Sequence, residues 1–179
     1  LPESRGVHKP KCVSPSKVEG EDSTYEATKY TTFAHRLTTK AGDGKDSTIG
    51  DFIHHAMYLW SGDRSILAPL AKEYGVEVDI DALESSITSF WTWMEQRYGK
   101  ATATERELPF SYTNADGQVV TGEIDLVYHT NDGDVLVDYK TYQGNEAHLT
   151  DEGHKFHAGK YSGQIALYEE ALRLRGDNI

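Results

Sequence analysis

The spacing of apolar residues predicts three helices, then a group of strands, then a final helix. Apolar side chains recur every three or four positions over 47–60, 65–74, 79–98 and 156–175, which is the period of a helix with one buried face. Between 107 and 140 the pattern changes to the alternation that is typical of strands. The chain therefore combines a helical first part with a sheet.

Polar residues at the ends of these ranges indicate where the helices begin and stop. Ser47 or Thr48 is expected to cap the first helix, and Asp79 or Asp81 the third. Gly99 is expected to terminate the third helix. The range 24–39 is mixed, and its pattern indicates a helix only weakly.

The predicted strands form a meander. They are expected over 107–112, 119–129 and 134–140, separated by short polar turns. Helices followed by a meander and a last helix indicate one α/β domain with a sheet covered by helices. Residues 1–24 are polar and contain three prolines, so we expect an irregular lead-in to a single domain over 25–179.

The composition excludes several classes of protein. The chain has 179 residues, of which 37% are apolar and 11% aromatic, enough for one sizeable core. No stretch approaches the roughly 20 apolar residues of a membrane helix, so no membrane association is expected. A single cysteine, Cys12, excludes a disulfide framework and a thiolate zinc site within the chain, and favours a cytoplasmic setting. The chain does not begin with Met and its first residues show no signal-peptide pattern, so we interpret Leu1 as a cut made inside a longer protein.

The charge is strongly negative. With 18 basic and 29 acidic residues, the net charge is −11. Such a domain repels nucleic acid at long range, which argues against a free-standing DNA-binding protein. A metal-dependent enzyme that acts on phosphates is still compatible, because its site needs carboxylates and the bound cation partly reverses the local sign.

Three charged residues stand at the end of the last predicted hairpin. Asp138 and Lys140 are two apart and therefore share a strand face. A four-residue turn would place Asp125 opposite Asp138, and a two-residue turn would place it opposite Lys140; both registers put all three on one face. A divalent-metal site and a surface salt bridge both fit this pattern, although the apolar run 135–137 before the charges counts against the salt bridge.

Four short motifs then suggest a family. Gly50–His54 reads Gly-x-x-x-His on a helix, Gly122–Asp125 reads Gly-x-Ile-Asp, Asp138–Lys140 reads Asp-Tyr-Lys, and Gln164–Tyr168 reads Gln-x-x-x-Tyr. In this order they resemble the RecB-like branch of the PD-(D/E)XK nucleases, which is found at the C-terminus of helicase–nucleases. The resemblance covers roughly 10–175 and implies a restriction-endonuclease-like mixed sheet flanked by helices. Without a cysteine cluster, the iron–sulfur version of the family is excluded.

The resemblance implies a Mg²⁺-dependent deoxyribonuclease. His54, Asp125, Asp138 and the backbone carbonyl of Tyr139 would hold the Mg²⁺, and a histidine ligand would also suit Mn²⁺. Lys140 would act with the two aspartates in catalysis, orienting or helping to deprotonate the attacking water. The implied partners are DNA, the helicase motor of the same parent chain and a partner subunit, in recombinational DNA repair. Motor and partner would supply the DNA affinity that this acidic domain lacks.

Several polar residues near the motifs allow more than one interpretation. Gln164 and Tyr168 are one helical turn apart and are expected beside the site as substrate-binding residues, although Tyr168 could equally be a core aromatic. Glu107 resembles an acidic position near such sites, but a solvated strand face is favoured. We expect Glu123 to point to the face opposite Asp125, outside the ligand set.

Two other functions remain open. One is a catalytically silent nuclease-fold module that binds DNA ends or braces a complex; the other is a metal-dependent phosphohydrolase acting on a small molecule. The three intact charged residues argue against the silent module. A cluster of histidines could form a second metal site or a phosphate contact, but a flexible polar loop is favoured: His148, His154 and His157.

Overall fold

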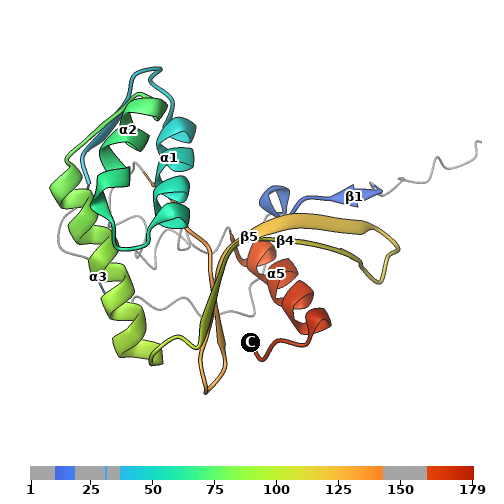
Figure 1. Cartoon of the computed structure of the whole chain (residues 1–179). Helices are drawn as coiled ribbons and strands as arrows, with labels where there is room; N and C mark the ends of the chain where they lie inside the picture. Colours follow the sequence, from blue (N-terminus) through green and yellow to red (C-terminus); the bar gives the residue numbers. More distant parts are fainter. Residues whose placement is uncertain (1–10, 19–30, 32–36, 143–160) are drawn as a thin grey trace, which may run out of the picture.

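A computed structural model of the chain describes residues 11–18, 31, 37–142 and 161–179 (Figure 1). The elements follow one another as β1 (Cys12–Val13), η1 (Pro15–Lys17), β2 (Thr39–Ala41), α1 (Asp46–Leu59), η2 (Arg64–Ile66), α2 (Leu67–Tyr74), β3 (Val76–Val78), α3 (Ile80–Tyr98), β4 (Ala103–Thr113), β5 (Val119–His129), β6 (Asp134–Val137) and α5 (Ser162–Arg175). No helix within these described residues is long and apolar enough to cross a bilayer.

The central strand of the sheet is β5. It pairs with β4 in antiparallel fashion along its length, and its other edge is shared by β1 and β6. β1 runs parallel to the start of β5, whereas β6 runs antiparallel to its end. The expected mixed sheet flanked by helices is therefore confirmed.

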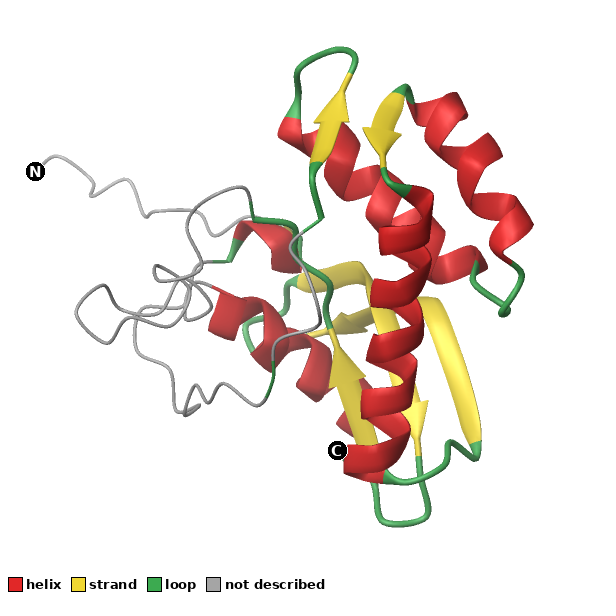
Figure 2. Ribbon diagram, turned by 90° about the vertical axis from the view of Figure 1, so that its left-hand side faces the viewer, coloured by secondary structure: helices red, strands yellow, loops and turns green. Residues whose placement is uncertain are grey.

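The β4–β5 hairpin curves strongly, and different helices cover different parts of its length (Figures 1 and 2). Leu126 and Tyr128 pack against α3, near the closed end of the β5–β6 hairpin. Ile124 and Val127 pack instead against α5. The strand is consequently buried on both faces around residue 125, where the candidate site lies.

The helices α1 and α2 and the first part of α3 form a separate core. Phe52, Leu67 and Leu83 are buried at its centre. The short ribbon of β2 and β3 closes the same core, with Ala41 paired to Val76. This packing fixes the position of α1, the helix that carries the first motif.

The ends of the helices agree only in part with the expectations. Asp79 caps α3 as expected, because its carboxylate accepts from two backbone N–H groups of the first turn. The expected cap of α1 is wrong: α1 begins at Asp46, and neither Ser47 nor Thr48 precedes it. Asp43 instead accepts from the Thr48 hydroxyl at 2.9 Å, which ties the preceding loop to the helix.

Several segments depart from the predicted elements: β4 begins at Ala103 rather than Glu107, and neither β1 nor β3 was predicted. Thr39–Ala41 is a strand at the end of the range for which a weak helix was suggested, and most of that range lies outside the described residues. The last strand ends at Val137 rather than Lys140. The last helix, α5, is described from Ser162. The part of it that was predicted over 156–160 lies outside the described residues.

Candidate active site

The register between β5 and β6 brings two motif aspartates level. Leu126 pairs with Val137, so Asp125 lies level with Asp138, as the four-residue turn predicts. Beyond Val137 the chain leaves the ladder, and the backbone N–H of Tyr139 donates to Oδ2 of Asp125 at 2.6 Å. The carboxylate of Asp125 thus fixes the backbone of the Asp-Tyr-Lys motif.

His54 reaches the same point from α1. Its Nε2 lies 2.8 Å from the carbonyl oxygen of Tyr139, and its Nδ1 lies 3.5 Å from Oδ1 of Asp125. The Asp125 carboxylate raises the pKa of His54, against the opposing effect of burial. Three of the expected metal ligands, two side chains and one carbonyl, therefore converge.

Asp138 is held by two partners. Its Oδ2 lies 2.5 Å from Nζ of Lys140, and its Oδ1 accepts from Nε2 of Gln164 at 3.2 Å. Only 5% of the Asp138 side chain is exposed, and this burial raises its pKa, although Lys140 acts in the opposite direction. Gln164 also donates to the hydroxyl of Tyr168 at 2.6 Å. Gln164 and Tyr168 are both buried, and Tyr168 belongs to the core under α5.

Glu107 joins this group from β4. The pairs Arg106–Leu126 and Leu108–Ile124 flank it, so it lies across from Asp125 without being paired to it, and its φ of 49° is the one positive value of a non-glycine residue in the described part of the chain. Ligand atoms of Glu107, Asp125 and His54 lie within 4.8 Å of one another. Burial raises the pKa of Glu107, and the neighbouring carboxylates Asp125 and Glu123 raise it further. The interpretation of Glu107 as part of a solvated strand face is wrong.

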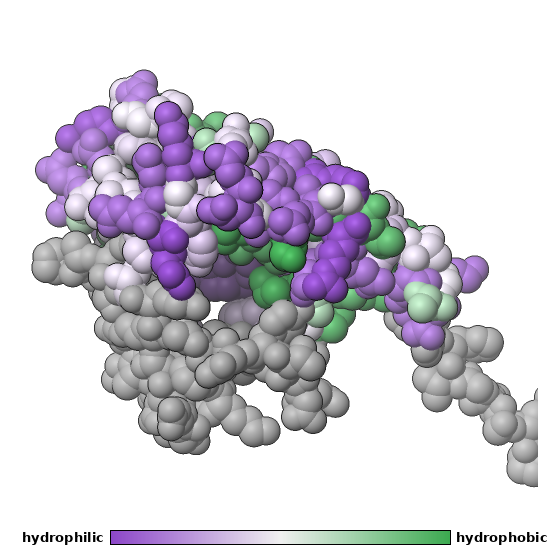
Figure 3. All heavy atoms as spheres, turned by 90° about the horizontal axis from the view of Figure 1, so that it is seen from below, coloured by the Kyte–Doolittle hydropathy of each residue, from purple (hydrophilic) through white to green (hydrophobic). Residues whose placement is uncertain are grey.

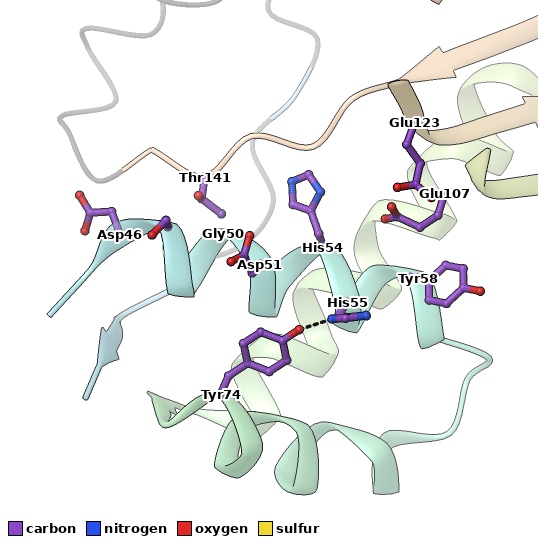
Figure 4. A pocket seen from close by; sticks show the side chains of 11 residues that line it. Asp46, Gly50, Asp51, His54, His55, Tyr58, Tyr74, Glu107, Glu123 and Thr141 are labelled. Atoms are coloured by element: carbon purple, nitrogen blue, oxygen red, sulfur yellow. Dashed lines mark hydrogen bonds between the residues drawn. The ribbon is translucent and has the colours of Figure 1, made fainter. Parts of the chain in front are cut away.

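The expectation for Glu123 is also wrong. Strand residues two apart point to the same side, so Glu123 shares the face of Asp125 rather than the opposite one. Glu123 and Glu107 lie next to each other on the wall of a hollow of about 840 Å³ (Figure 4). Glu123 is exposed and does not belong to the group whose ligand atoms lie within 4.8 Å.

The glycines of two motifs permit close approach of other segments. A Cβ on Gly50 would lie 3.3 Å from Oγ1 of Thr141, just after the Asp-Tyr-Lys motif. A Cβ on Gly122 would lie 3.0 Å from the ring of Phe110 and 3.2 Å from Pro15. A side chain at either position would therefore push apart segments that position the site.

Arg106 fastens α1 to the sheet. Its Nη1 donates to the carbonyl oxygens of Met57, Tyr58 and Trp60, at 3.2, 2.9 and 2.5 Å, where α1 ends. Its guanidinium also lies over the ring of Trp91, 4.8 Å from the centroid. The positive charge thus satisfies the free carbonyls at the helix C-terminus. Sequence reasoning missed Arg106, because the partner carbonyls are set by tertiary packing.

A second histidine–carboxylate group lies at the other end of β5. His129 contacts Asp134 through Nδ1 at 2.6 Å and Glu105 through Nε2 at 2.9 Å. Arg175 contacts Glu105 and Asp177, with contacts of 2.6 to 3.0 Å. This group joins β4, β5 and β6 to the end of α5.

Comparisons with known proteins agree with the motifs. The chain matches the model of the PD-(D/E)XK nuclease superfamily over residues 23–178. It is 37% identical over 148 residues to an ATP-dependent helicase/nuclease subunit of Lactobacillus acidophilus, covering 76% of this chain and 11% of the relative. The protein of the same name from Anoxybacillus flavithermus is 36% identical over 106 residues, 58% of this chain and 8% of the relative. The chain thus spans about a tenth of these curated relatives.

Proposed function

The chain belongs to the PD-(D/E)XK nuclease superfamily, and we propose that it is the DNA-cleaving domain of a larger helicase–nuclease, hydrolysing phosphodiester bonds with a divalent ion. The observation that carries this proposal is the meeting of His54, Asp125 and the Tyr139 carbonyl beside the Asp138–Lys140 pair. The named relatives are helicase/nuclease subunits of far greater length, which supports a parent chain with a motor.

The donor set fits a hard divalent cation. It offers carboxylate oxygens, one backbone oxygen and one imidazole nitrogen, and three of its side chains already lie within 4.8 Å of one another. Mg²⁺ favours such oxygen ligands together with water, and the imidazole also suits Mn²⁺. Burial is the main cause of the raised pKa of Glu107, and a cation here would relieve the added repulsion from Asp125 and Glu123.

When bound, such an ion would polarise the scissile phosphate and lower the pKa of a coordinated water. The residues of the chain would hold the reacting groups around it. Lys140 presents its ammonium beside Asp138, where it would orient the attacking water and offset charge on the phosphate in the transition state. Gln164, which is buried, would keep the Asp138 carboxylate in place, and Tyr168 would keep Gln164 in place. The hydrogen bonds of Gln164 and Tyr168 favour a role in positioning the Asp138 carboxylate over direct binding of DNA.

The acidic charge suggests that other parts of the parent protein bind the DNA that this domain cuts. With a net charge of −11, the domain gains little from the general attraction between protein and phosphate. Among the residues coloured in Figure 3, hydrophilic ones predominate, and hydrophobic ones gather near the centre of the view and to its right. We therefore assign DNA affinity to the motor and a partner subunit, in the cytoplasm, and cutting to this domain.

A cleavage assay tests the proposal. The chain, alone and within its parent protein, is incubated with end-labelled single- and double-stranded DNA in Mg²⁺, Mn²⁺ or EDTA. Cleavage is expected with the ions, and none in EDTA or with Asp125→Asn. Cleavage that persists in EDTA would contradict the metal-dependent mechanism. If the folded protein cuts no DNA in either setting, the silent module or the small-molecule phosphohydrolase becomes the better account.

A further inference from the structure

The hollow beside the candidate ligands has an aromatic wall. His55 and Tyr58 lie on α1 and Tyr74 at the end of α2, and Nδ1 of His55 is hydrogen-bonded to the Tyr74 hydroxyl (Figure 4). The His55 ring lies 5.6 Å from the Tyr74 ring and 6.4 Å from the Tyr58 ring, centroid to centroid. Tyr58 is 43% exposed, so part of this wall is open to solvent.

This aromatic wall adjoins the candidate metal centre directly. His54 and His55 are consecutive, so their Cα atoms are about 3.8 Å apart, and both line the hollow. The His54 ring turns to the Tyr139 carbonyl while the His55 ring turns to Tyr74.

The charges of the hollow restrict what can bind there. Four of its lining residues carry carboxylates, and none of the described ones is a lysine or arginine: Asp46, Asp51, Glu107 and Glu123. A row of phosphates would be repelled along this surface, except where a divalent ion neutralises one. The faces of nucleobases carry no net charge, and they stack on aromatic rings regardless of sequence.

We propose that the aromatic wall of His55, Tyr58 and Tyr74 is a stacking subsite for the nucleobases that flank the scissile phosphate. The inference rests on the proposed nuclease function and specifies the substrate further. Bases inside a duplex are covered by their neighbours and reach an aromatic ring only after unstacking. The subsite therefore favours cleavage where the bases are unpaired.

The test compares variants of α1 on paired and unpaired DNA. Tyr58→Ala should raise KM for a single-stranded oligonucleotide by roughly 5-fold or more, the usual effect of removing one stacking ring, with kcat and ion affinity retained. Tyr58→Phe keeps the ring and should behave as the wild type. Leu59→Ala is the matched control, since Leu59 is 46% exposed on the same helix and is not among the residues lining the hollow. KM for a duplex of the same sequence should change by less.

Binding to a cleavage-inactive protein separates this inference from the nuclease function. The affinity of Asp138→Asn for the single strand is measured by fluorescence anisotropy with Mg²⁺, with and without Tyr58→Ala. A several-fold loss on adding Tyr58→Ala supports the subsite even if no variant cuts DNA. If Tyr58→Ala matches Leu59→Ala, or weakens single strand and duplex equally, the stacking subsite is refuted while the nuclease proposal stands.

Discussion

Two histidine–carboxylate groups include residues of the same strands, β4 and β5, and among the described residues they differ in that an arginine pairs with the carboxylates of only one group. Glu107, Asp125 and His54 form the first; Glu105, His129, Asp134 and Asp177 form the second. In both, a histidine and at least two carboxylates offer ligand atoms within 4.8 Å of one another. Geometry alone would make each a candidate metal site.

Neighbouring glutamates of β4 show how the two groups differ. Hydrogen bonds from Arg175 lower the pKa of Glu105, whereas burial and nearby carboxylates raise the pKa of Glu107. In the second group both ring nitrogens of His129 have carboxylate partners, and Arg175 supplies a permanent positive charge. Within the described residues, the structure records no lysine or arginine at salt-bridge distance from Glu107 or Asp125. The carboxylates of the second group are thus paired with a permanent cation, which favours a structural role, whereas among the described residues those of the first are not, which supports the metal site proposed above.

The largest effect is expected from Asp138, which lies level with Asp125 of the first group. Asp138→Asn should lower the cleavage rate by about 1,000-fold or more, roughly 4 kcal/mol of transition-state stabilisation. Because burial raises the pKa of Asp138, its charge costs stability at pH 7, and the melting temperature without metal should stay equal or rise. Cleavage assays and thermal unfolding measure both effects. A near wild-type rate would remove Asp138 from the site.

Replacing Lys140 should separate catalysis from ion binding. The ammonium cannot bind a cation, so Lys140→Ala should retain ion affinity or strengthen it slightly. The rate should fall by about 100-fold, the scale of a missing proton-transfer or water-orienting group. Calorimetry and cleavage assays on the same preparation give the comparison. Loss of ion binding together with activity would show that the Lys140–Asp138 pair is a structural salt bridge.

Arg106 connects the first group to the fold. Arg106→Ala would leave three carbonyls at the end of α1 without this partner and should cost about 2–3 kcal/mol of unfolding free energy. Ion affinity should also fall, because α1 carries His54. Arg173→Ala is the control: the Arg173 side chain is 65% exposed, and its pair with Glu169 one helical turn away should contribute about 0.5 kcal/mol or less. Equal losses in urea unfolding for both variants would contradict the role of Arg106.

The smallest effect is a pH dependence in the second group. Burial opposes the charged form of His129, but hydrogen bonds to Glu105 and Asp134 outweigh it and raise its pKa. The stabilisation of the folded state by protonated His129 is therefore complete below the pKa that His129 has in the unfolded state. It disappears as pH rises through the raised pKa of the folded state. The difference in unfolding free energy between wild type and His129→Gln should be about 1 kcal/mol near pH 6 and shrink by pH 9. Asp177 and Arg175 carry constant charges over this range. A difference that grows with pH would contradict the assignment.

The sequence predicted the motif residues better than their neighbours. The bounds of β5 and the meeting of Asp125, Asp138 and Lys140 followed from alternation and hairpin geometry. Two registers had remained open, since both turn lengths suited the same hydrophobic pattern. The position of Glu107 beside Asp125 was missed, because the alternation of the first predicted strand does not give its register against the second.

The remaining features depend on contacts distant in the chain. Arg106 meets α1 across more than 40 residues of sequence, and the short strands β1, β2 and β3 gain their structure from pairing rather than from local propensity. The error for Glu123 was of another kind. The period of a strand already places it beside Asp125, so the sequence contained the signal.

A titration of Mn²⁺ into the metal-free protein, followed by calorimetry, tests the central claim most directly. The wild type, His54→Ala and His129→Ala are compared at one pH, after thermal unfolding has shown that all three are folded. We predict that the wild type binds Mn²⁺, that His54→Ala binds it more weakly, and that His129→Ala retains the wild-type affinity. Unchanged binding in His54→Ala together with loss in His129→Ala would place the ion in the second group and contradict the account.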